Sequence, residues 1–289
     1  MNLRDAVEHW LDHLIAARSL AGNTLKAYQG DLEEFARFVE SEHLDWQTFG
    51  ATGTHHFAQT LQKTRTPRSA ARKLSALRTF YRHALVQGWA GGVPPARTRT
   101  LPSADRGLPR ILSVAQTEKL IESTASPLEL AVLELLYATG IKAGELCELR
   151  VRDVAFAEAY LSVQPAAAQP RVVPMGEPAL AAVETYLGSE PVLPERWLFV
   201  GRQNRPLNRF HIYRIVREAA ARSAIDWPVT PDTLRHSFAV HLLEGGADLA
   251  TVRELLGHAS LATTGIYTRL ARNYAAGRLR TDGTPNHLG

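Results

Sequence analysis

The chain has 289 residues, of which 45% are hydrophobic and 21% charged, a composition typical of a folded protein with room for two domains. Its one cysteine, Cys147, excludes a disulfide framework and a cysteine-based zinc site, which favours a reducing compartment. No apolar run approaches the roughly 18 residues of a membrane span, and the opening residues MNLRDAVEHW lack the pattern of a signal peptide. We therefore expect a cytoplasmic protein with no membrane partner.

The distribution of charge is more informative than the net charge of +4. Residues 47 to 104 contain no Asp or Glu, whereas the preceding stretch up to Asp45 is acidic. A solvated helix surface normally mixes both signs, so a purely basic stretch favours contact with a polyanion, above all nucleic acid. The basic residues of this stretch are Lys63, Arg65, Arg68, Arg72, Lys73, Arg78, Arg82, Arg97 and Arg99.

The first hundred residues have the apolar spacing of helices, which we expect over residues 3–20, 23–42 and 66–88. In the third of these, Thr66 is expected to cap the helix and Pro67 to occupy its first position. Its expected apolar stripe consists of Ala70, Leu74, Leu77, Tyr81 and Ala84. Four arginines share another flank at the helical period, namely Arg68, Arg72, Arg78 and Arg82. This pattern predicts a helical domain with a hydrophobic core on one side and phosphate-binding charge on another.

Residues 89–110 are rich in Gly, Pro and Arg and have no periodic pattern, which is typical of a linker between domains. We expect an N-terminal helical domain over residues 1–92, a basic linker over 93–109 and a C-terminal domain over 110–289.

The C-terminal domain is expected to be mostly helical around a small antiparallel sheet. Capping boxes beginning at Ser113 and Ser126 precede helices, and the second of these helices is expected to end at Gly140. Strands are expected over residues 159–164 and 171–175 as a hairpin, with 197–200 as a short third strand. Further helices are expected over residues 210–224, 230–246, 249–258 and 261–277.

The stretch LGHASLATTGIYTR places His258 nine residues before Tyr267. An isolated tyrosine usually packs in a core, so a nucleophilic role needs support from other residues. Arg235 precedes both in TPDTLRHSFAVHLL, and the three form an ordered series of guanidinium, imidazole and phenol.

These motifs resemble the C-terminal signature of the tyrosine recombinases, the phage integrase family, and the whole chain is similar to its bacterial Xer-type members. The segments LRHSFAVHLL, ELLGHASLATT and IYT carry the signature. The segments NTLKAYQGDLEEFARFV and RSAARKLSALRTFYRHAL resemble the family's N-terminal core-binding domain. The resemblance implies a SAM-like helical domain followed by a mostly helical catalytic domain with a small antiparallel sheet.

It also implies a reaction on DNA. Tyr267 would attack a backbone phosphate and become joined to the 3′ phosphate while a 5′ hydroxyl is released, without a metal or a nucleotide cofactor. A phenol with an ordinary pKa of about 10 is a weak nucleophile at neutral pH, so guanidinium groups such as Arg235 would stabilise the charge that builds on the phosphate. His258 would assist proton transfer and hold the phosphate.

Three positions depart from the family's pattern. At the position of the family's first arginine this chain has Lys142, in ATGIKAGEL. At the position of the hairpin lysine it has Ala166, in QPAAAQP, and in place of the histidine three residues before Arg235 it has Asp232. A lysine keeps the charge but lacks the planar fork of arginine, and alanine donates no proton. Two arginines, Arg171 and Arg202, are candidates to supply a replacement cation.

Several residues near the motifs have more than one interpretation. Asp232 is expected to face the phosphate, to pair with Lys142 or Arg235, or to cap its helix. We expect His236 and His241 to pack beside the site, His55 and His56 to lie at a helix start or in a loop, and Cys147 to be a small buried residue.

Two functions follow from the pattern. The first is a site-specific recombinase that cuts and exchanges strands of double-stranded DNA, as a homo- or hetero-tetramer with a second recombinase and with no small-molecule substrate. The alternative is a homologue impaired in cleavage that acts as a DNA-binding structural or regulatory partner. A relaxing topoisomerase of related chemistry is a third interpretation, which the recombinase-like N-terminal domain disfavours.

Overall fold

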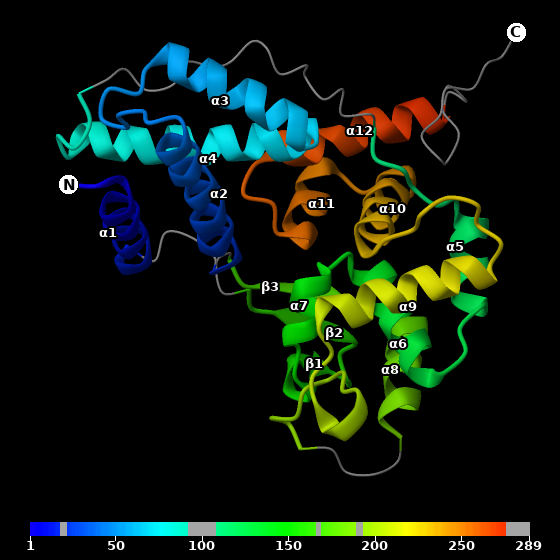
Figure 1. The fold of residues 1–289 in the computed structure, drawn as a ribbon. Coiled ribbons are helices and arrows are strands. Elements are labelled where there is room, and N and C mark those ends of the chain that lie inside the picture. The colour runs from blue at the N-terminus through cyan, green and yellow to red at the C-terminus, as the bar shows by residue number, and fades with distance from the viewer. Residues whose placement is uncertain (18–21, 92–107, 166–168, 189–192, 276–289) are drawn as a thin grey trace, which may run out of the picture. The chain divides into compact units, whose positions relative to one another are not determined.

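The structure is a computed structural model that describes residues 1–17, 22–91, 108–165, 169–188 and 193–275. The chain divides into two compact units, Met1–Arg106 and Gly107–Gly289, and each has a hydrophobic core of its own. Figure 1 draws the helices of the first unit in blue and cyan and the elements of the second unit from green to red.

The described part of the first unit is helical, and the three expected helices are confirmed. A further helix, α3, was not expected, although its buried residues Thr54, Phe57, Ala58 and Leu61 have helical spacing. His55 and His56 lie on its exposed side, inside the helix. The helices are α1 (Leu3–Ala16), α2 (Gly22–Ser41), α3 (Ala51–Thr64) and α4 (Pro67–Val86).

Local signals fix the start of α4. Thr66 accepts a hydrogen bond from the backbone N–H of Ser69, and Pro67 occupies the first turn, as expected. The expected apolar stripe of α4 is buried in full, and Tyr81 within it donates a 2.6 Å hydrogen bond to the carbonyl of Trp46. Aromatic rings from all four helices of this unit fill the core around Phe35 and Phe80.

The described part of the second unit is also mostly helical. The expected capping box at Ser113 is confirmed. Ser126 caps α6 by accepting from the N–H of Glu129, but the side chain of Glu129 accepts from the N–H of Ala125, so the expected reciprocal box is not formed there. The expected end of α6 at Gly140 is confirmed, in the left-handed conformation with φ of 60°. Helix α8 was not expected. The helices are α5 (Val114–Glu122), α6 (Pro127–Thr139), α7 (Ala143–Glu148), α8 (Glu177–Leu187), α9 (Arg209–Arg222), α10 (Pro231–Glu244), α11 (Leu249–Leu256) and α12 (Leu261–Ala275), with short 3₁₀ helices at Val151–Asp153 and Arg202–Asn204.

A small antiparallel sheet has the order β1 (Val154–Ala155), β2 (Tyr160–Val163), β3 (Arg171–Pro174). The expected hairpin is confirmed as β2 and β3. The expected strand at 197–200 is wrong, because this segment makes only isolated bridges, to Arg150 and Pro206, and β1 takes the third position in the sheet. Leu198 and Phe199 are buried, so the apolar run fills the core without joining the sheet.

Helices α10, α11 and α12 pack together around a separate apolar cluster that includes Phe238, Val252, Leu256 and Leu270 (Figure 1). Tyr267 belongs to this cluster. The candidate active site is built where these helices meet.

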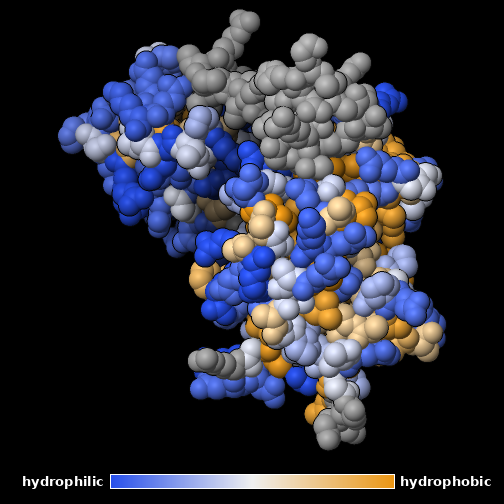
Figure 2. All heavy atoms as spheres, turned by 90° about the vertical axis from the view of Figure 1, so that its right-hand side faces the viewer, coloured by the Kyte–Doolittle hydropathy of each residue, from blue (hydrophilic) through white to orange (hydrophobic). Residues whose placement is uncertain are grey.

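The visible face in Figure 2 is mostly hydrophilic, with hydrophobic side chains in scattered groups. No helix among the described residues is both long and apolar enough to span a bilayer.

Candidate active site

Arg235 is the buried centre of the site. Helix α10 begins at a capping box formed by Thr230 and Thr233, so that Arg235 lies in its second turn with only 4% of its surface exposed. Its Nη1 donates to the carbonyl of Gly140 at 2.5 Å and its Nη2 to the carbonyl of Leu256 at 2.7 Å.

These two carbonyls end helices α6 and α11, where helix dipoles favour a cation. Burial lowers the pKa of Arg235, with the charge of Glu145 acting in the opposite direction. An arginine nevertheless stays charged near neutral pH. The two carbonyl groups compensate this buried charge, and the guanidinium has further N–H groups that these carbonyls do not engage.

His258 follows α11 directly, after Gly257 ends the helix in the left-handed conformation. Its Nε2 lies 3.1 Å from Nη2 of Arg235, and its Nδ1 lies 2.9 Å from Oγ1 of Thr264. Burial lowers the pKa of His258 to about 4, helped by the nearby charges of Arg235 and Lys142. The ring is therefore neutral at pH 7, and because arginine only donates, Nε2 accepts and Nδ1 donates to Thr264.

Tyr267 lies on α12 with 3% of its surface exposed. Its ring stacks on that of His258, with centroids 6.2 Å apart and an angle of 10° between the planes. Its hydroxyl lies 2.9 Å from Nδ1 of His236. Burial raises the pKa of the phenol, and the guanidinium of Arg235 acts in the opposite direction. The structure thus brings Arg235, His258 and Tyr267 together, from three segments of the chain.

Lys142 stands at the start of α7 and its side chain is exposed. Its backbone N–H donates to Oε2 of Glu145 at 2.9 Å. The charge of its ammonium contributes to the lowered pKa of His258, which places this cation in the electrostatic environment of the site.

Asp232 is exposed in the first turn of α10, where a negative charge is favourable beside the helix N-terminus. The expectation that it caps the helix is wrong, because Thr230 is the cap. Among ion pairs between described residues it pairs with neither Lys142 nor Arg235. Instead it accepts a 3.4 Å hydrogen bond from the hydroxyl of Tyr213 on α9.

Arg171 is buried and committed to other groups. Its guanidinium forms a two-point pair with Glu145, at 3.2 and 2.7 Å, and its Nε donates to the carbonyl of Leu255 at 2.7 Å. This arrangement holds strand β3, helix α7 and the end of α11 together, so Arg171 has a structural role where a replacement cation for the phosphate was expected. The side chain of Arg202 and the whole of Ala166 lie outside the described residues.

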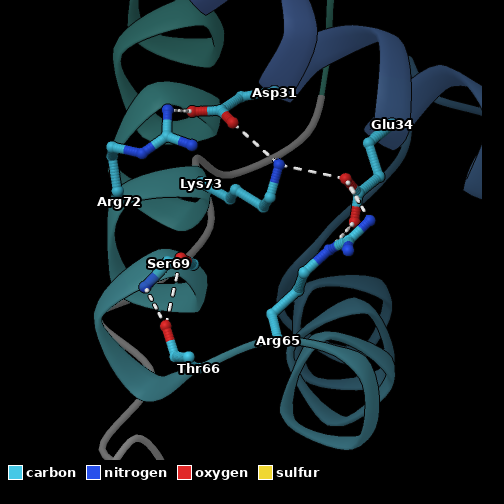
Figure 3. Close-up of polar contacts among 7 residues, drawn as sticks. All are labelled: Asp31, Glu34, Arg65, Thr66, Ser69, Arg72 and Lys73. Carbon is cyan, nitrogen blue, oxygen red and sulfur yellow. Dashed lines mark hydrogen bonds and ion pairs between the residues drawn. The ribbon is translucent and has the colours of Figure 1, made fainter. Parts of the chain in front are cut away.

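In the first unit, several basic residues that were expected to bind DNA are paired with acids of α2 (Figure 3). Arg72 and Lys73 both bond to Asp31, which is buried, and Lys73 also pairs with Glu34 at 3.0 Å. Arg65 makes a two-point contact with the same Glu34, at 3.2 and 3.1 Å. This network joins α2 to α4 and to the end of α3, and it reduces the positive charge that these residues offer to a ligand.

The other basic side chains of this surface are more available. Lys63, Arg68 and Arg82 are exposed and Arg78 is half-buried. None of these four takes part in an ion pair with another described residue. Arg97 and Arg99 lie outside the described residues, as does most of the expected linker.

His236 is the site residue that sequence reasoning undervalued. It was expected to pack beside the site, and the structure places it on the hydroxyl of Tyr267. Its position next to Arg235 on α10 was visible in the sequence, but the contact depends on how α12 packs against α10. In the described part of the chain, no group of three His, Cys, Asp or Glu side chains is placed to hold a metal ion.

A mainly helical fold that gathers a buried guanidinium, an imidazole and a phenol defines the class of the tyrosine recombinases, and the chain belongs to the phage integrase family. The model described as "Phage integrase family" matches residues 106–273, and that described as "Phage integrase, N-terminal SAM-like domain" matches residues 7–88. The chain is 36% identical to tyrosine recombinase XerD of Listeria monocytogenes serovar 1/2a, over 93% of this chain and 95% of that protein.

Two solved structures share the fold. The integrase of the Tn1549 transposon in complex with a circular intermediate DNA has a TM-score of 0.72 at 16% identity, covering 94% of this chain and 98% of the other. A lambda integrase tetramer bound to a Holliday junction has a TM-score of 0.71 at 20% identity, covering 92% and 77%. The expected fold class, with an N-terminal SAM-like domain and a mostly helical second domain, is confirmed.

Proposed function

We propose that this chain is a site-specific DNA recombinase that cleaves and rejoins strands through a covalent link between Tyr267 and a 3′ phosphate. The observation that supports this most directly is the convergence of Arg235, His258 and Tyr267 within contact distance. Membership of a family of tyrosine recombinases and the basic helical surface of the first unit support it further.

Arg235 would stabilise the charge that develops on the phosphate. Of its five N–H groups, three are engaged by Gly140, Leu256 and His258. A further donor acts on the hydroxyl of Tyr267. In this proposal the edge of the guanidinium beside that phenol binds a non-bridging oxygen, in a position fixed by the two carbonyls before DNA binds. Such preorganised donors are typically worth about 100- to 1000-fold in rate.

Lys142 would supply both charge and a proton. It replaces an arginine, which holds its proton at any physiological pH, with an ammonium group that is able to donate one. The position of the family's hairpin lysine is Ala166, which has no proton to give. In this proposal the bond from phosphorus to Oη of Tyr267 forms, the bond to the 5′ oxygen breaks, and that oxygen takes its proton from Lys142.

We further propose that both domains, over residues 1–92 and 110–289, bind duplex DNA, and that the basic linker over 93–109 contributes positive charge to this binding. The protein would act as a homo- or hetero-tetramer with a second recombinase, on cytoplasmic DNA. The basic residues Lys63, Arg68, Arg78 and Arg82 would contact phosphates in this assembly.

A covalent adduct tests the proposal. The purified protein is incubated with nicked duplexes that trap the cleaved strand, and a denaturing gel is read for a protein–DNA adduct that is absent in Tyr267→Phe. Failure to form this adduct on duplexes that the protein binds specifically would contradict the proposed activity.

A DNA-binding partner with little cleavage activity is the second candidate, and the departures at Lys142, Ala166 and Asp232 favour it. Asp232 brings a carboxylate near a site that binds a phosphate. Replacing the three together, as Lys142→Arg, Ala166→Lys and Asp232→His, should raise the rate of adduct formation if these positions limit it. An unchanged rate would show that the three positions do not limit cleavage.

A further inference from the structure

His236 is in hydrogen-bond contact with the attacking atom, on which Arg235 also acts. Its Nδ1 lies 2.9 Å from Oη of Tyr267, with ring centroids 5.6 Å apart. The contact joins the second turn of α10 to α12, and both residues are held within the packing of these helices. A nucleophile in this position has its proton acceptor already in place.

The surroundings set the direction of this hydrogen bond. Burial lowers the pKa of His236, the charge of Arg235 adds to this, and Asp232 acts in the opposite direction. The ring is therefore neutral at pH 7, so one of its nitrogens accepts. The guanidinium of Arg235, which only donates, acts on the phenol as well. The phenol therefore directs its own hydrogen to Nδ1 of His236.

We infer that His236 is the base that takes the proton of Tyr267 when the phenol attacks the phosphate. The phenol proton passes to Nδ1 as the bond from Oη to phosphorus forms, and the 5′ oxygen leaves with a proton from Lys142. When the 5′ hydroxyl attacks in the reverse direction, both protons return. The inference rests on the proposed recombinase activity and assigns one of its steps.

Asp232 makes this assignment specific to the present chain. The family resemblance implies a histidine at that position, and here the residue is a carboxylate bonded to Tyr213. His258 directs Nε2 to Arg235 and Nδ1 to Thr264, so both of its nitrogens are engaged. His236 is the remaining imidazole of the site.

The chain offers a closely matched control. His241, also on α10, makes the same kind of contact, with Nδ1 at 2.9 Å from the hydroxyl of Tyr137. Burial lowers its pKa as well. His241→Gln therefore reports the cost of removing a half-buried imidazole from a tyrosine hydroxyl on this helix, without touching the attacking atom.

The test compares His236→Gln, His241→Gln and wild type in single-turnover adduct formation on a nicked duplex. Glutamine still accepts a hydrogen bond from the phenol but takes no proton, so we expect cleavage to slow by about 100-fold or more. The affinity for duplex and the melting temperature should match those of His241→Gln, whose cleavage rate should stay near wild type.

The pH profile adds a readout that a packing role would not change. The wild-type rate should fall as His236 is protonated, at a pH below the ordinary histidine value of about 6.5. The charged and titratable groups facing this site are Asp232 and Arg235 on α10, Lys142 at α7 and His258, whose pKa of about 4 separates its effect. The His236→Gln profile should lack this fall and rise with pH toward the pKa of the phenol.

A substrate with sulfur in place of the bridging 5′ oxygen separates the two protons. The sulfur leaves without protonation, so this substrate should relieve a defect at Lys142 and leave the His236→Gln defect intact. Equal cleavage by His236→Gln and wild type would overturn the inference while the proposed function stands. A wild-type protein that forms no Tyr267 adduct would overturn the proposed function and the inference with it.

Nitrogen-15 spectra of histidine-labelled protein without DNA give a further test that needs no cleavage. At pH 7, Nδ1 of His236 should carry no hydrogen, and its signal should move in Tyr267→Phe. A hydrogen on Nδ1 would overturn the inference, because a protonated nitrogen accepts nothing from the phenol.

Discussion

Replacing Glu145 with glutamine removes one partner of the buried pair that supports the site. The side chains of Glu145 and Arg171 are only 7% and 6% exposed, and their two hydrogen bonds are 2.7 and 3.2 Å long. Removing one charge from a buried pair typically costs about 3–5 kcal/mol, because the other charge stays buried without compensation. Glutamine keeps the size of the side chain and one acceptor oxygen, so we expect the free energy of unfolding to fall by about 3 kcal/mol.

Thermal unfolding measures this loss. A unit of this size loses about 2–4 °C in Tm per kcal/mol, so Glu145→Gln should lower the Tm of the second unit by roughly 6–12 °C. Glu148→Gln, on the exposed side of the same helix, should change stability by no more than about 0.5 kcal/mol. Combining Glu145→Gln with Arg171→Met removes both charges and should recover part of the loss.

The loss of stability caused by Glu145→Gln should depend on pH, and the substitution should also affect the active site. Burial raises the pKa of Glu145, but the hydrogen bonds and charge of Arg171 and the N–H of Lys142 outweigh it, so the pKa is lowered. The stability from this carboxylate is therefore present above the ordinary glutamate pKa of about 4.3 and is lost as the pH falls through the lowered value. Arg171 also supports the carbonyl of Leu255 near His258, so adduct formation should slow as well. A Tm within 2 °C of the Glu148→Gln control would refute this account of the pair.

Three further outcomes are expected. Replacing Arg68, Arg78 and Arg82, which form no ion pair with another described residue, with alanine should weaken binding to all duplexes. The slope of log affinity against log salt concentration should fall by about 0.9 for each phosphate that is no longer neutralised. The control Arg4→Ala should leave this slope unchanged, because Arg4 pairs with Glu40. Lys142→Arg alone should slow cleavage of ordinary DNA and leave cleavage of the sulfur-bridged substrate nearly unaffected. The same slowing on both substrates would contradict a role of Lys142 as proton donor. Asp31→Asn should destabilise the first unit by about 3 kcal/mol in chemical unfolding, since it leaves Lys73 buried with less compensation.

The sequence predicted those features that depend on local chemistry. Thr66, Ser113 and Gly140 stand where a capping hydroxyl or a left-handed residue is required, and the structure confirms each helix end. The resemblance to the tyrosine recombinase signature predicted that His258 and Tyr267 share one site. The structure brings their rings together, because Tyr267 lies in the second turn of α12, which begins three residues after His258.

Features that depend on packing between distant segments were missed. Arg171 follows an ordinary strand pattern, and its pairing with Glu145 arises only when β3 lies against α7 and α11. The segment 197–200 has the composition of a strand, but Leu198 and Phe199 serve the core, and the two-residue strand β1 was too short to give a periodic signal. The acids of α2 that neutralise Arg65 and Lys73 are about 30 to 40 residues away in the chain, beyond the reach of a local charge count.

The balance of charge in the site connects the two candidate functions. Lys142 and Arg235 bring positive charge, Asp232 brings a negative charge, the pair of Glu145 and Arg171 is neutral, and His258 is uncharged at pH 7. One net positive charge matches a phosphodiester in the ground state, but the transition state of its cleavage carries more negative charge than that. We expect such a site to bind DNA well and to cleave it slowly, since only interactions that strengthen in the transition state accelerate the reaction. The two candidate functions then differ in the rate of adduct formation relative to the lifetime of the complex. The proposed base His236, already in contact with Oη of Tyr267, favours the cleaving recombinase.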